Sequence, residues 1–322
     1  MTGSNPLAQA VFSRRIVSAD SDAIEAAAHI LRDGGIVAVP TETVYGLAAD
    51  AHNADAVAAI YRTKGRPDFN PLIVHVPDVA AAQALAIFDG RAEALAAAFW
   101  PGPLTMVLQL RQDAKIASAV TADLSTIAVR CPAHPVMQAL IRASGLNLAA
   151  PSANRSGGIS PTRAIHVADS LNDAAPMILD GGPCTAGLES TIVALRPSDW
   201  QILREGPVTG FMLETVLKSA PMIVTGDKIE APGQMASHYA PSKPLRLNAN
   251  ARHAGEYWIG FGAIEGDQNL SPTGNLIEAA AHLFDALHCA DASDARSIAV
   301  APIPNEGIGA AIHDRLNRAA IR

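Results

Sequence analysis

The sequence is poor in the features that mark several large classes of protein. It has only three cysteines among 322 residues, Cys131, Cys184 and Cys289, an odd number spread far apart. This usage argues against a disulfide-stapled secreted scaffold and predicts a cytoplasmic protein whose cysteines are small buried side chains. Residues 1–15 have no apolar segment typical of a secretory signal. No apolar run reaches the ~18–20 residues that a membrane span needs, so we expect no membrane association.

Positive charge is also scarce. With 24 Lys and Arg against 31 Asp and Glu, the net charge is −7. Proteins that mainly grip nucleic acid carry a basic surface, so we expect no strong direct nucleic-acid binding. Against this background Arg62, Lys64 and Arg66 form a local cluster of cations. Such a cluster indicates a focused anion site and not a broad nucleic-acid surface.

Several common ligand motifs are absent. The dipeptide Gly-Lys does not occur, which excludes a Walker-type phosphate loop. Gly260 and Gly262 follow an apolar run, but Glu265 stands where a dinucleotide-binding fingerprint needs a third glycine. No paired cysteines or closely spaced histidines suggest a zinc centre, and no carboxylate cage is evident. The sequence therefore predicts no dedicated metal site.

Apolar strands alternate with alanine-rich helices along most of the chain, and 49% of residues are hydrophobic. We predict an α/β domain over residues 1–219, with a twisted mixed sheet and flanking helices. Residues 220–244 are rich in Pro and Gly and predict a linker, and residues 245–322 predict a small Rossmann-like α/β domain. The expected strands are 35–39, 72–76, 104–110, 125–130, 148–150, 177–179, 191–195, 201–203, 257–261 and 297–301. The expected helices are 21–33, 55–63, 78–86, 91–99, 135–143, 208–219, 275–288 and 308–320.

Two separated segments place polar groups at turns beside strands. Lys64 and Arg66 flank a glycine at the end of an expected helix, with Asn70 just downstream. Ser152 and Asn154 follow the strand at 148–150. Two cations at a helix end are explained by dipole complementarity alone. Cations, amides and hydroxyls converging from two loops are better explained by a polyphosphate, whose charge is costly to bury unpaired.

Four further positions remain open on the residues alone. His75 shares one face of its strand with Ile73, and a strand histidine is either a satisfied structural residue or a ligand contact. Arg130 ends an apolar strand, where it would form a surface ion pair or clamp a carboxylate. Ser190 lies at the mouth of another strand and Arg204 at the end of the next, where turn chemistry is the simple alternative.

With Pro40-Thr41-Glu42-Thr43-Val44-Tyr45-Gly46-Leu47 upstream, the Lys-x-Arg and Ser-x-Asn segments resemble the YrdC-like family in its long, two-domain form. The stretch from Gly307 to Leu316 resembles the terminal helix of the family's second domain. Family members bind ATP and L-threonine in a concave cavity. By resemblance, the catalytic cations would be Lys64 and Arg66, and the threonine contacts would be Thr43, His75, Arg130, Ala150 and Ser190. The nucleotide contacts would be Lys64, Arg66, Asn70, Thr126, Ser152, Asn154, Ser160, Arg204, His238 and Tyr239.

The resemblance also implies a reaction. L-threonine, bicarbonate and ATP would give threonylcarbamoyl-AMP and pyrophosphate, as an L-threonylcarbamoyladenylate synthase, a nucleotidyltransferase, does for N6-threonylcarbamoyladenosine (t6A) in tRNA. Mg²⁺ would arrive with ATP, and downstream threonylcarbamoyl-transfer proteins would take the product to tRNA. His238 and Tyr239 suggest that residues 232–241 form a lid over the nucleotide. The family often has arginine where this chain has Ser237, which leaves a linker cation contact open.

Two alternatives belong to other classes. The same cationic cavity would serve an RNA-binding module, which needs RNA but no threonine. A carbamoyl-adenylating relative in hydrogenase maturation would carry zinc-finger and acylphosphatase segments, and this chain has neither.

Overall fold

The computed structural model describes residues 15–222, 230–233 and 238–321. Its larger part is a mixed sheet of ten strands in the order β1-β8-β2-β3-β7-β4-β6-β5-β9-β10. The strands are β1 (Ile16–Ser18), β2 (Val37–Val39), β3 (Gly46–Asp50), β4 (Ile73–His75), β5 (Leu104–Gln109), β6 (Thr126–Arg130), β7 (Leu148–Ala149), β8 (Met177–Asp180), β9 (Thr191–Leu195) and β10 (Trp200–Arg204). Parallel and antiparallel neighbours both occur, so the predicted mixed α/β sheet is confirmed.

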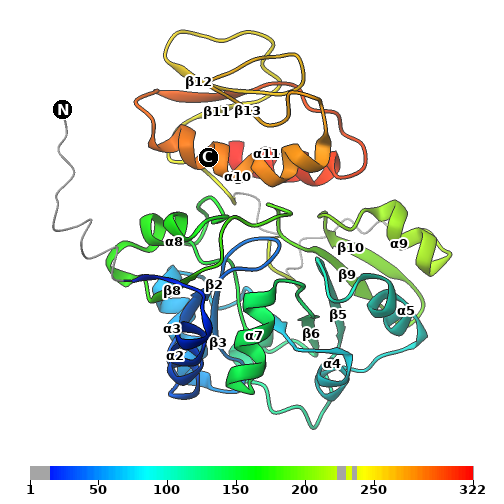
Figure 1. Cartoon of the computed structure of the whole chain (residues 1–322). Helices are drawn as coiled ribbons and strands as arrows, with labels where there is room; N and C mark the ends of the chain where they lie inside the picture. Colours follow the sequence, from blue (N-terminus) through cyan, green and yellow to red (C-terminus); the bar gives the residue numbers. More distant parts are fainter. Residues whose placement is uncertain (1–14, 223–229, 234–237, 322) are drawn as a thin grey trace.

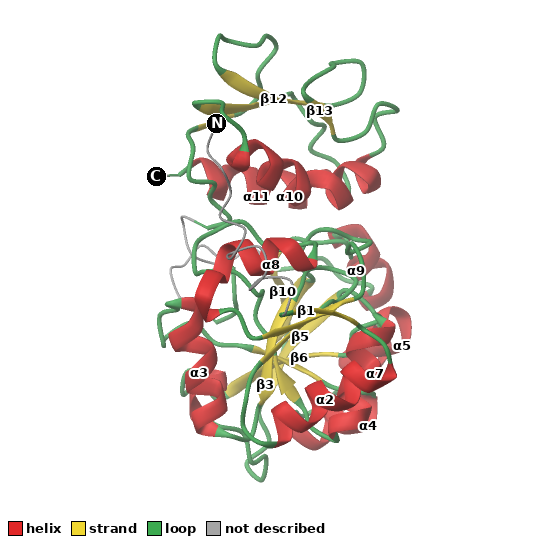
Figure 2. Cartoon of the chain, turned by 60° about the vertical axis from the view of Figure 1, so that its left-hand side comes forward, coloured by secondary structure: helices red, strands yellow, loops and turns green. Residues whose placement is uncertain are grey.

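Helices cover both faces of this sheet (Figure 2). Side chains of α2 and α7 pack in one apolar cluster with β2 and β8, while those of α3, α4, α5 and α8 belong to another. The helices are α2 (Ser21–Arg32), α3 (Ala54–Lys64), α4 (Val79–Leu85), α5 (Gly90–Phe99), α6 (Ser118–Thr121), α7 (Pro135–Ser144), α8 (Ala164–Leu171) and α9 (Gly210–Leu217), with a 3₁₀ turn at Asn172–Ala174. Burial on both faces explains why the strands read as continuous apolar runs.

Helix ends decide where the polar loops begin. Helix α3 stops at Gly65, whose φ of 59° is left-handed, and this turn delivers Lys64 and Arg66 as the sequence predicts. Helix α2 begins just after its N-cap, Asp20, which accepts a hydrogen bond from the backbone N–H of Ala23. A carboxylate one residue before the first helical turn captures the free N–H groups directly.

The sequence missed several short elements. Strand β3 is alanine-rich and strands β1, β11 and β13 have only two or three residues, so neither alternation nor β-propensity identifies them. Helix α8 has eight residues and follows a long irregular loop. These elements form through tertiary pairing, which local sequence does not encode.

A second sheet of four parallel strands forms a smaller unit, in the order β11-β14-β12-β13. Its elements are β11 (Leu245–Arg246), β12 (Glu256–Gly260), β13 (Gln268–Asn269), α10 (Leu276–Ala292), β14 (Ser297–Val300) and α11 (Gly309–Ala320). Figure 1 shows α10 and α11 between the small sheet and the larger unit. The predicted small C-terminal α/β fold is confirmed, with its two helices facing the ten-stranded part.

The two units share one apolar cluster. Val44, Ile159, Leu188 and Tyr239 pack with the buried side chains of α10 and α11. Gly187 lies so close to α10 that a Cβ there would be 2.4 Å from the backbone oxygen of Ala281. The loop that carries Gly187 is therefore seated directly on a helix of the small unit.

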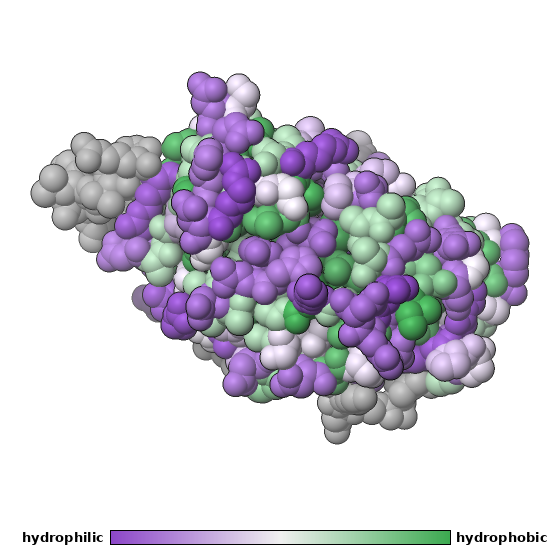
Figure 3. All heavy atoms as spheres, turned by 90° about the horizontal axis from the view of Figure 1, so that it is seen from below, coloured by the Kyte–Doolittle hydropathy of each residue, from purple (hydrophilic) through white to green (hydrophobic). Residues whose placement is uncertain are grey.

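Polar contacts add to this interface. The Nε atom of Arg163 donates to Asp285 at 2.6 Å, and the rings of His166 and His288 stack with centroids 3.9 Å apart. The underside of the larger unit, far from this interface, shows mostly polar side chains with scattered apolar ones (Figure 3). Within the part of the chain that the structure describes, no helix has both the length and the apolar character needed to cross a membrane.

Candidate active site

A cavity of about 530 Å³, including its mouth, lies where the larger unit meets the chain that leads to the small one. It is walled by strand ends and loops of the larger unit and closed by residues on either side of 234–237, which are outside the described residues. The lining residues are Thr41, Thr43, Val44, Gly46, Arg66, Ile73, His75, Arg130, Ala150, Pro151, Ser152, Glu189, Ser190, Arg204, Pro232, Gly233, His238 and Tyr239. Ten of the predicted site residues are therefore brought to one cavity.

One wall is built by two parallel strands. His75 at the end of β4 is paired in register with Arg130 at the end of β6, so both side chains reach the same cavity. Ile73 lines the cavity beside His75, whereas Leu72 and Val74 belong to the apolar core. The predicted alternation of this strand is thus confirmed. Burial, together with the nearby charge of Arg130, lowers the pKa of His75 to about 3, which keeps the imidazole neutral near pH 7.

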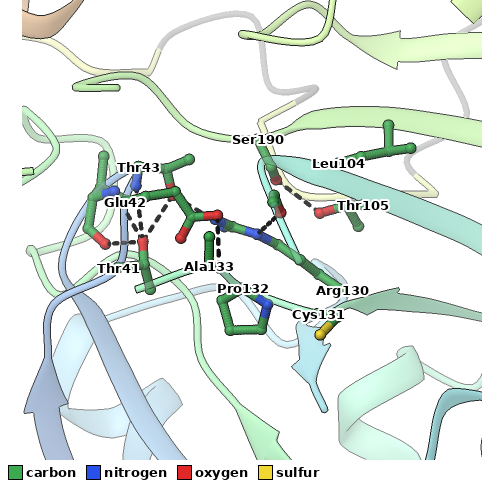
Figure 4. A network of polar contacts seen from close by, with 12 residues as sticks. Thr41, Glu42, Thr43, Leu104, Thr105, Arg130, Cys131, Pro132, Ala133 and Ser190 are labelled. Carbon is green, nitrogen blue, oxygen red and sulfur yellow. Dashed lines mark hydrogen bonds and ion pairs between the residues drawn. The ribbon is translucent and has the colours of Figure 1, made fainter. Parts of the chain in front are cut away.

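Arg130 is already paired inside the protein. Its Nη2 atom lies 2.7 Å from a carboxylate oxygen of Glu42, and its Nη1 donates to Thr43 at 3.0 Å. Figure 4 shows the Glu42 carboxylate pointing toward the guanidinium. Nε donates to the carbonyl of Gly102 at 3.2 Å. These contacts fix the plane of the guanidinium, so its orientation does not depend on a ligand.

Ser190 links this wall to the next. Its hydroxyl is 2.7 Å from that of Thr105 on β5, and Nη2 of Arg204 donates to it at 3.1 Å. Nε of Arg204 donates to the Ser190 carbonyl at 3.0 Å. The turn predicted at the mouth of β9 is therefore hydrogen-bonded to the end of β10. Ser190 and Arg204 both line the cavity.

The second cation of the cavity is Arg66. Its Nη2 donates to the carbonyl of Pro71 at 3.0 Å and its Nε to that of Asn70 at 3.2 Å. Burial lowers the pKa of Arg66 to about 10 and also lowers the pKa of Arg204. Both guanidinium groups remain charged at neutral pH in a water-poor pocket, where electrostatic attraction to an anion is strong.

Lys64 lies behind the cavity wall. Its ammonium donates to the carbonyls of Ser152 and Asn154, each at 2.5 Å, and the side chain is buried. Burial, with a further effect of Arg66, lowers the pKa of Lys64 well below its usual range. We expected Lys64, at a helix end, to contact the nucleotide; the structure makes it a buried support of the Ser152 turn.

The remaining predicted nucleotide contacts do not line the cavity. Asn154 donates to the carbonyls of Arg155 and Gly158, both at 2.8 Å, and so shapes the turn that presents Ser152. Asn70 is buried beneath Arg66, and the Ser160 hydroxyl donates to Glu189. Thr126 is at the opposite end of β6 from Arg130, in a separate hollow with Arg91 and Gln109. The structure therefore places Thr126 apart from the other predicted residues.

His238 and Tyr239 close the cavity. Tyr239 is fully buried with a φ of 63°, a backbone region that non-glycine residues seldom adopt. Burial, with a contribution from nearby cations, lowers the pKa of His238 to about 3. Among the described residues, His238 Nδ1 has no hydrogen-bond partner, which leaves a buried polar atom available beside the cavity. Ser237 lies outside the described residues.

The sequence analysis assigned no role to two carboxylates at the cavity. Glu42 orients Arg130, and Glu189 lines the cavity between Ser160 and Arg315. Both are flanked by hydroxyl-bearing residues at strand mouths, which was the available signal. Among the described residues, no cluster of three or more His, Cys, Asp or Glu side chains could hold a metal ion. The cavity presents cations and neutral donors, an arrangement suited to binding an anion.

Two family models match the chain almost end to end. The one described as "Telomere recombination" matches residues 29–206. The one described as "Threonylcarbamoyl-AMP synthase, C-terminal domain" matches residues 208–321. The boundary between the models falls just after β10, before helix α9.

Curated relatives match over the same length. The chain is 39% identical over 330 residues to the threonylcarbamoyl-AMP synthase of Bacillus subtilis, covering 94% of each. It is 37% identical over 323 residues to that of Pyrococcus abyssi, covering 92% of this chain and 94% of the relative. The solved structure of P. abyssi Sua5 complexed with L-threonine has a TM-score of 0.85 at 35% identity, over 92% of this chain and 94% of that one.

Proposed function

The chain belongs to the threonylcarbamoyl-AMP synthase family, in the form that joins a YrdC-like domain to a second domain, and from this premise we propose how its cavity works. It is a nucleotidyltransferase of the t6A tRNA modification. Its substrates are proposed to be L-threonine, bicarbonate and ATP. The observation that carries the proposal is the meeting of the His75–Arg130 wall with Arg66 and Arg204 in one cavity.

L-threonine is proposed to bind at the wall formed by β4 and β6. The amino-acid carboxylate would lie against the guanidinium of Arg130, which Glu42 and Gly102 already hold in orientation. The hydroxyls of Thr43 and Ser190 and the backbone at Ala150 border the same space. The neutral ring of His75 offers a donor or acceptor without adding charge. A substrate that is itself a zwitterion fits this mixture of one cation and several neutral groups.

ATP is proposed to bind with its phosphates toward Arg66, Arg204 and the Ser152 turn. Lys64 and Asn154 support that turn from behind, and Asn70 and Ser160 support Arg66 and Glu189 in the same way. His238 and Tyr239 would cover the nucleotide, and lid closure over residues 232–241 stays a prediction. We propose no nucleotide contact for Thr126 in the arrangement described above.

The chemistry needs no covalent enzyme intermediate. The threonine amine attacks bicarbonate, forming a C–N bond with loss of water, to give an N-carboxy species. An oxygen of this carboxylate then attacks the α-phosphorus of ATP, and the bond to pyrophosphate breaks. The protein positions the reactants and neutralises developing charge with Arg66 and Arg204. Mg²⁺ is proposed to enter as part of the MgATP substrate.

The product is proposed to pass to downstream threonylcarbamoyl-transfer proteins that act on tRNA. We also propose a cytoplasmic location, which the three free cysteines support. A protein that handed its product to others would itself need little affinity for tRNA, consistent with the net charge of −7.

The test is pyrophosphate release from MgATP with purified protein. Release is expected only when L-threonine and bicarbonate are both present, with threonylcarbamoyl-AMP formed in equal amount. An RNA-binding module would instead bind a tRNA transcript and release no pyrophosphate under any of these conditions. Release that proceeds equally without threonine would exclude the proposed reaction.

A further inference from the structure

One arginine of the small unit reaches the wall of the cavity. Arg315 lies on α11 in the stretch from Gly307 to Leu316, which the sequence singled out without assigning it a role. Its side chain is completely buried, although arginine is among the residues least often buried without a partner. A fully enclosed guanidinium must be satisfied by its neighbours, so the identity of those neighbours indicates what it does.

The partners of Arg315 come from both sides of the interface. Nε donates to a carboxylate oxygen of Glu189 at 2.7 Å, and Nη2 donates to the carbonyl of Glu205 at 2.9 Å. Nη1 donates to Asp314 at 2.6 Å. The guanidinium carbon also lies 5.1 Å from the centre of the Tyr239 ring, within cation–π range.

Two of these partners line the cavity, and a third adjoins a residue that does. Glu189 and Tyr239 are in the cavity wall, and Glu205 follows Arg204 directly in the chain. Burial opposes the charge of Glu189, yet Arg315 and then Arg204 outweigh it and hold the pKa of Glu189 below its usual range. Without Arg315, Glu189 would lose its main partner, and Arg204 would be the remaining cation beside it, where the carboxyl group would compete with phosphates.

Tyr239 also depends on the small unit. Its ring packs 5.7 Å from that of Phe284 on α10 while Arg315 faces it. Its left-handed backbone is strained and persists only where surrounding contacts determine it. The larger unit holds the neighbouring Ala240 through Gly157, while the small unit supplies the contacts to the ring from α10 and α11, so the position of the ring in the cavity wall depends on both units.

We propose that Arg315 is a positioning residue for ATP binding, through which the small unit completes the nucleotide side of the cavity. It does so by neutralising Glu189 and holding the Tyr239 ring. This inference rests on the function proposed above, because it assumes that the cavity takes ATP beside Arg204. The small unit would then take part in substrate binding, apart from any role in later steps of tRNA modification.

Simple docking of the two units is the competing explanation, and the interface offers a matched control. Arg163 forms an ion pair with Asp285 across the same interface, with its Nε 2.6 Å from the carboxylate. Arg163 is absent from the cavity wall, and its side chain is about half exposed. Arg163→Met therefore removes an interface arginine without disturbing Glu189 or Tyr239.

The experiment measures ATP and L-threonine binding separately, by equilibrium dialysis and calorimetry, on the full chain. Arg315→Lys keeps a positive charge near Glu189 but loses the planar fork and the ring contact. It is expected to weaken ATP binding by about 10- to 100-fold, with threonine binding unchanged and the protein still folded. Arg163→Met should leave both affinities unchanged. Arg315→Met should weaken ATP binding further. If Arg315→Met fails to fold, the ATP affinity of Arg315→Lys alone tests the inference.

ATP binding by Arg315→Lys that matches the wild type would overturn the inference. An equal loss in Arg163→Met would overturn it too, because docking alone would then account for the effect. Failure of the proposed function appears elsewhere, in wild-type protein that shows no threonine-dependent pyrophosphate release. The affinities are measured without turnover, so the two failures are distinguishable.

Discussion

Arg130 and Glu42 form a buried ion pair at the wall of the cavity, with 2.7 Å between Nη2 and the carboxylate oxygen. Burial opposes the charge of Glu42, but Arg130 outweighs it and holds the pKa of Glu42 below its usual range. The cation assigned to the substrate carboxylate is thus already paired with a protein carboxylate, and ligand binding adds a second anion to a preset guanidinium. The roles of the two residues can be separated by substitution.

Arg130→Ala is expected to damage threonine use far more than ATP use. Loss of a charged, bidentate donor should cost about 2–4 kcal/mol, or about a 30- to 700-fold rise in the threonine concentration needed for half-maximal rate. Threonine titrations at fixed ATP measure it. Because the substitution also orphans Glu42, Arg130→Ala with Glu42→Gln serves as the control for folding. An unchanged threonine dependence in folded protein would contradict the carboxylate assignment.

Lys64→Met should lower stability as well as ATP turnover. The substitution removes both hydrogen bonds to the Ser152 and Asn154 carbonyls, which are enclosed by the turn. Each backbone acceptor left without a donor should cost about 1–3 kcal/mol of unfolding free energy. Ser152→Ala changes the same turn at its cavity side and is expected to lower turnover while leaving the melting temperature unchanged. Equal melting of Lys64→Met and wild type would argue against the supporting role.

His75 should make stability depend on acidity. A histidine in the unfolded chain takes up a proton near its ordinary pKa of 6.5, whereas buried His75 does so only near a pKa of about 3. Between these values the unfolded state holds more protons, so stability falls as pH falls from about 6.5 toward 3. His75→Gln should reduce this slope by up to about 1.4 kcal/mol per pH unit. Urea unfolding at pH 4.5, 5.5 and 7 checks the slope; identical slopes would show that His75 is not buried in its neutral form.

Gly187→Ala is expected to separate the two units. The added Cβ would lie 2.4 Å from the backbone oxygen of Ala281, a clash that only movement of the loop or α10 relieves. Its φ of 69° adds about 1–2 kcal/mol of strain for any side chain. Limited proteolysis and ATP affinity are the measurements, with increased cleavage and weaker binding expected.

Gly182→Ala is the matched control for that substitution. Gly182 has a φ of 82°, but a Cβ added there would meet no heavy atom within 4 Å, so the variant carries the strain without the clash. It should lower the melting temperature slightly and leave ATP affinity intact. If both variants lose ATP affinity equally, strain and not the approach to α10 is responsible.

Much of the architecture follows from patterns within single segments. Alternation placed Ile73 and His75 on the cavity side of β4, and the glycine after α3 ended the helix where the cations are needed. The features that the sequence did not predict arise from contacts between segments far apart in the chain. Lys64 binds carbonyls 88 and 90 residues away, so its change from a surface cation to a buried support has no local signal.

The same limit explains the carboxylates and Arg315. The roles of Glu42 and Glu189 depend on ion pairs with arginines from β6 and α11, which only the folded chain brings to them. Thr126 shows a different limit, because a strand has two ends. Arg130 reaches the cavity from one end of β6, and Thr126, four residues earlier, belongs to the other. Motif matching assigns residues without regard to that separation.

The Tyr239 ring belongs at once to the apolar cluster of the small unit and to the wall of the cavity. A random change on the inner face of α10, such as at Phe284, therefore alters folding and substrate recognition together. In this chain, a replacement for the small unit would therefore have to rebuild part of the cavity wall as well as the interface between the units.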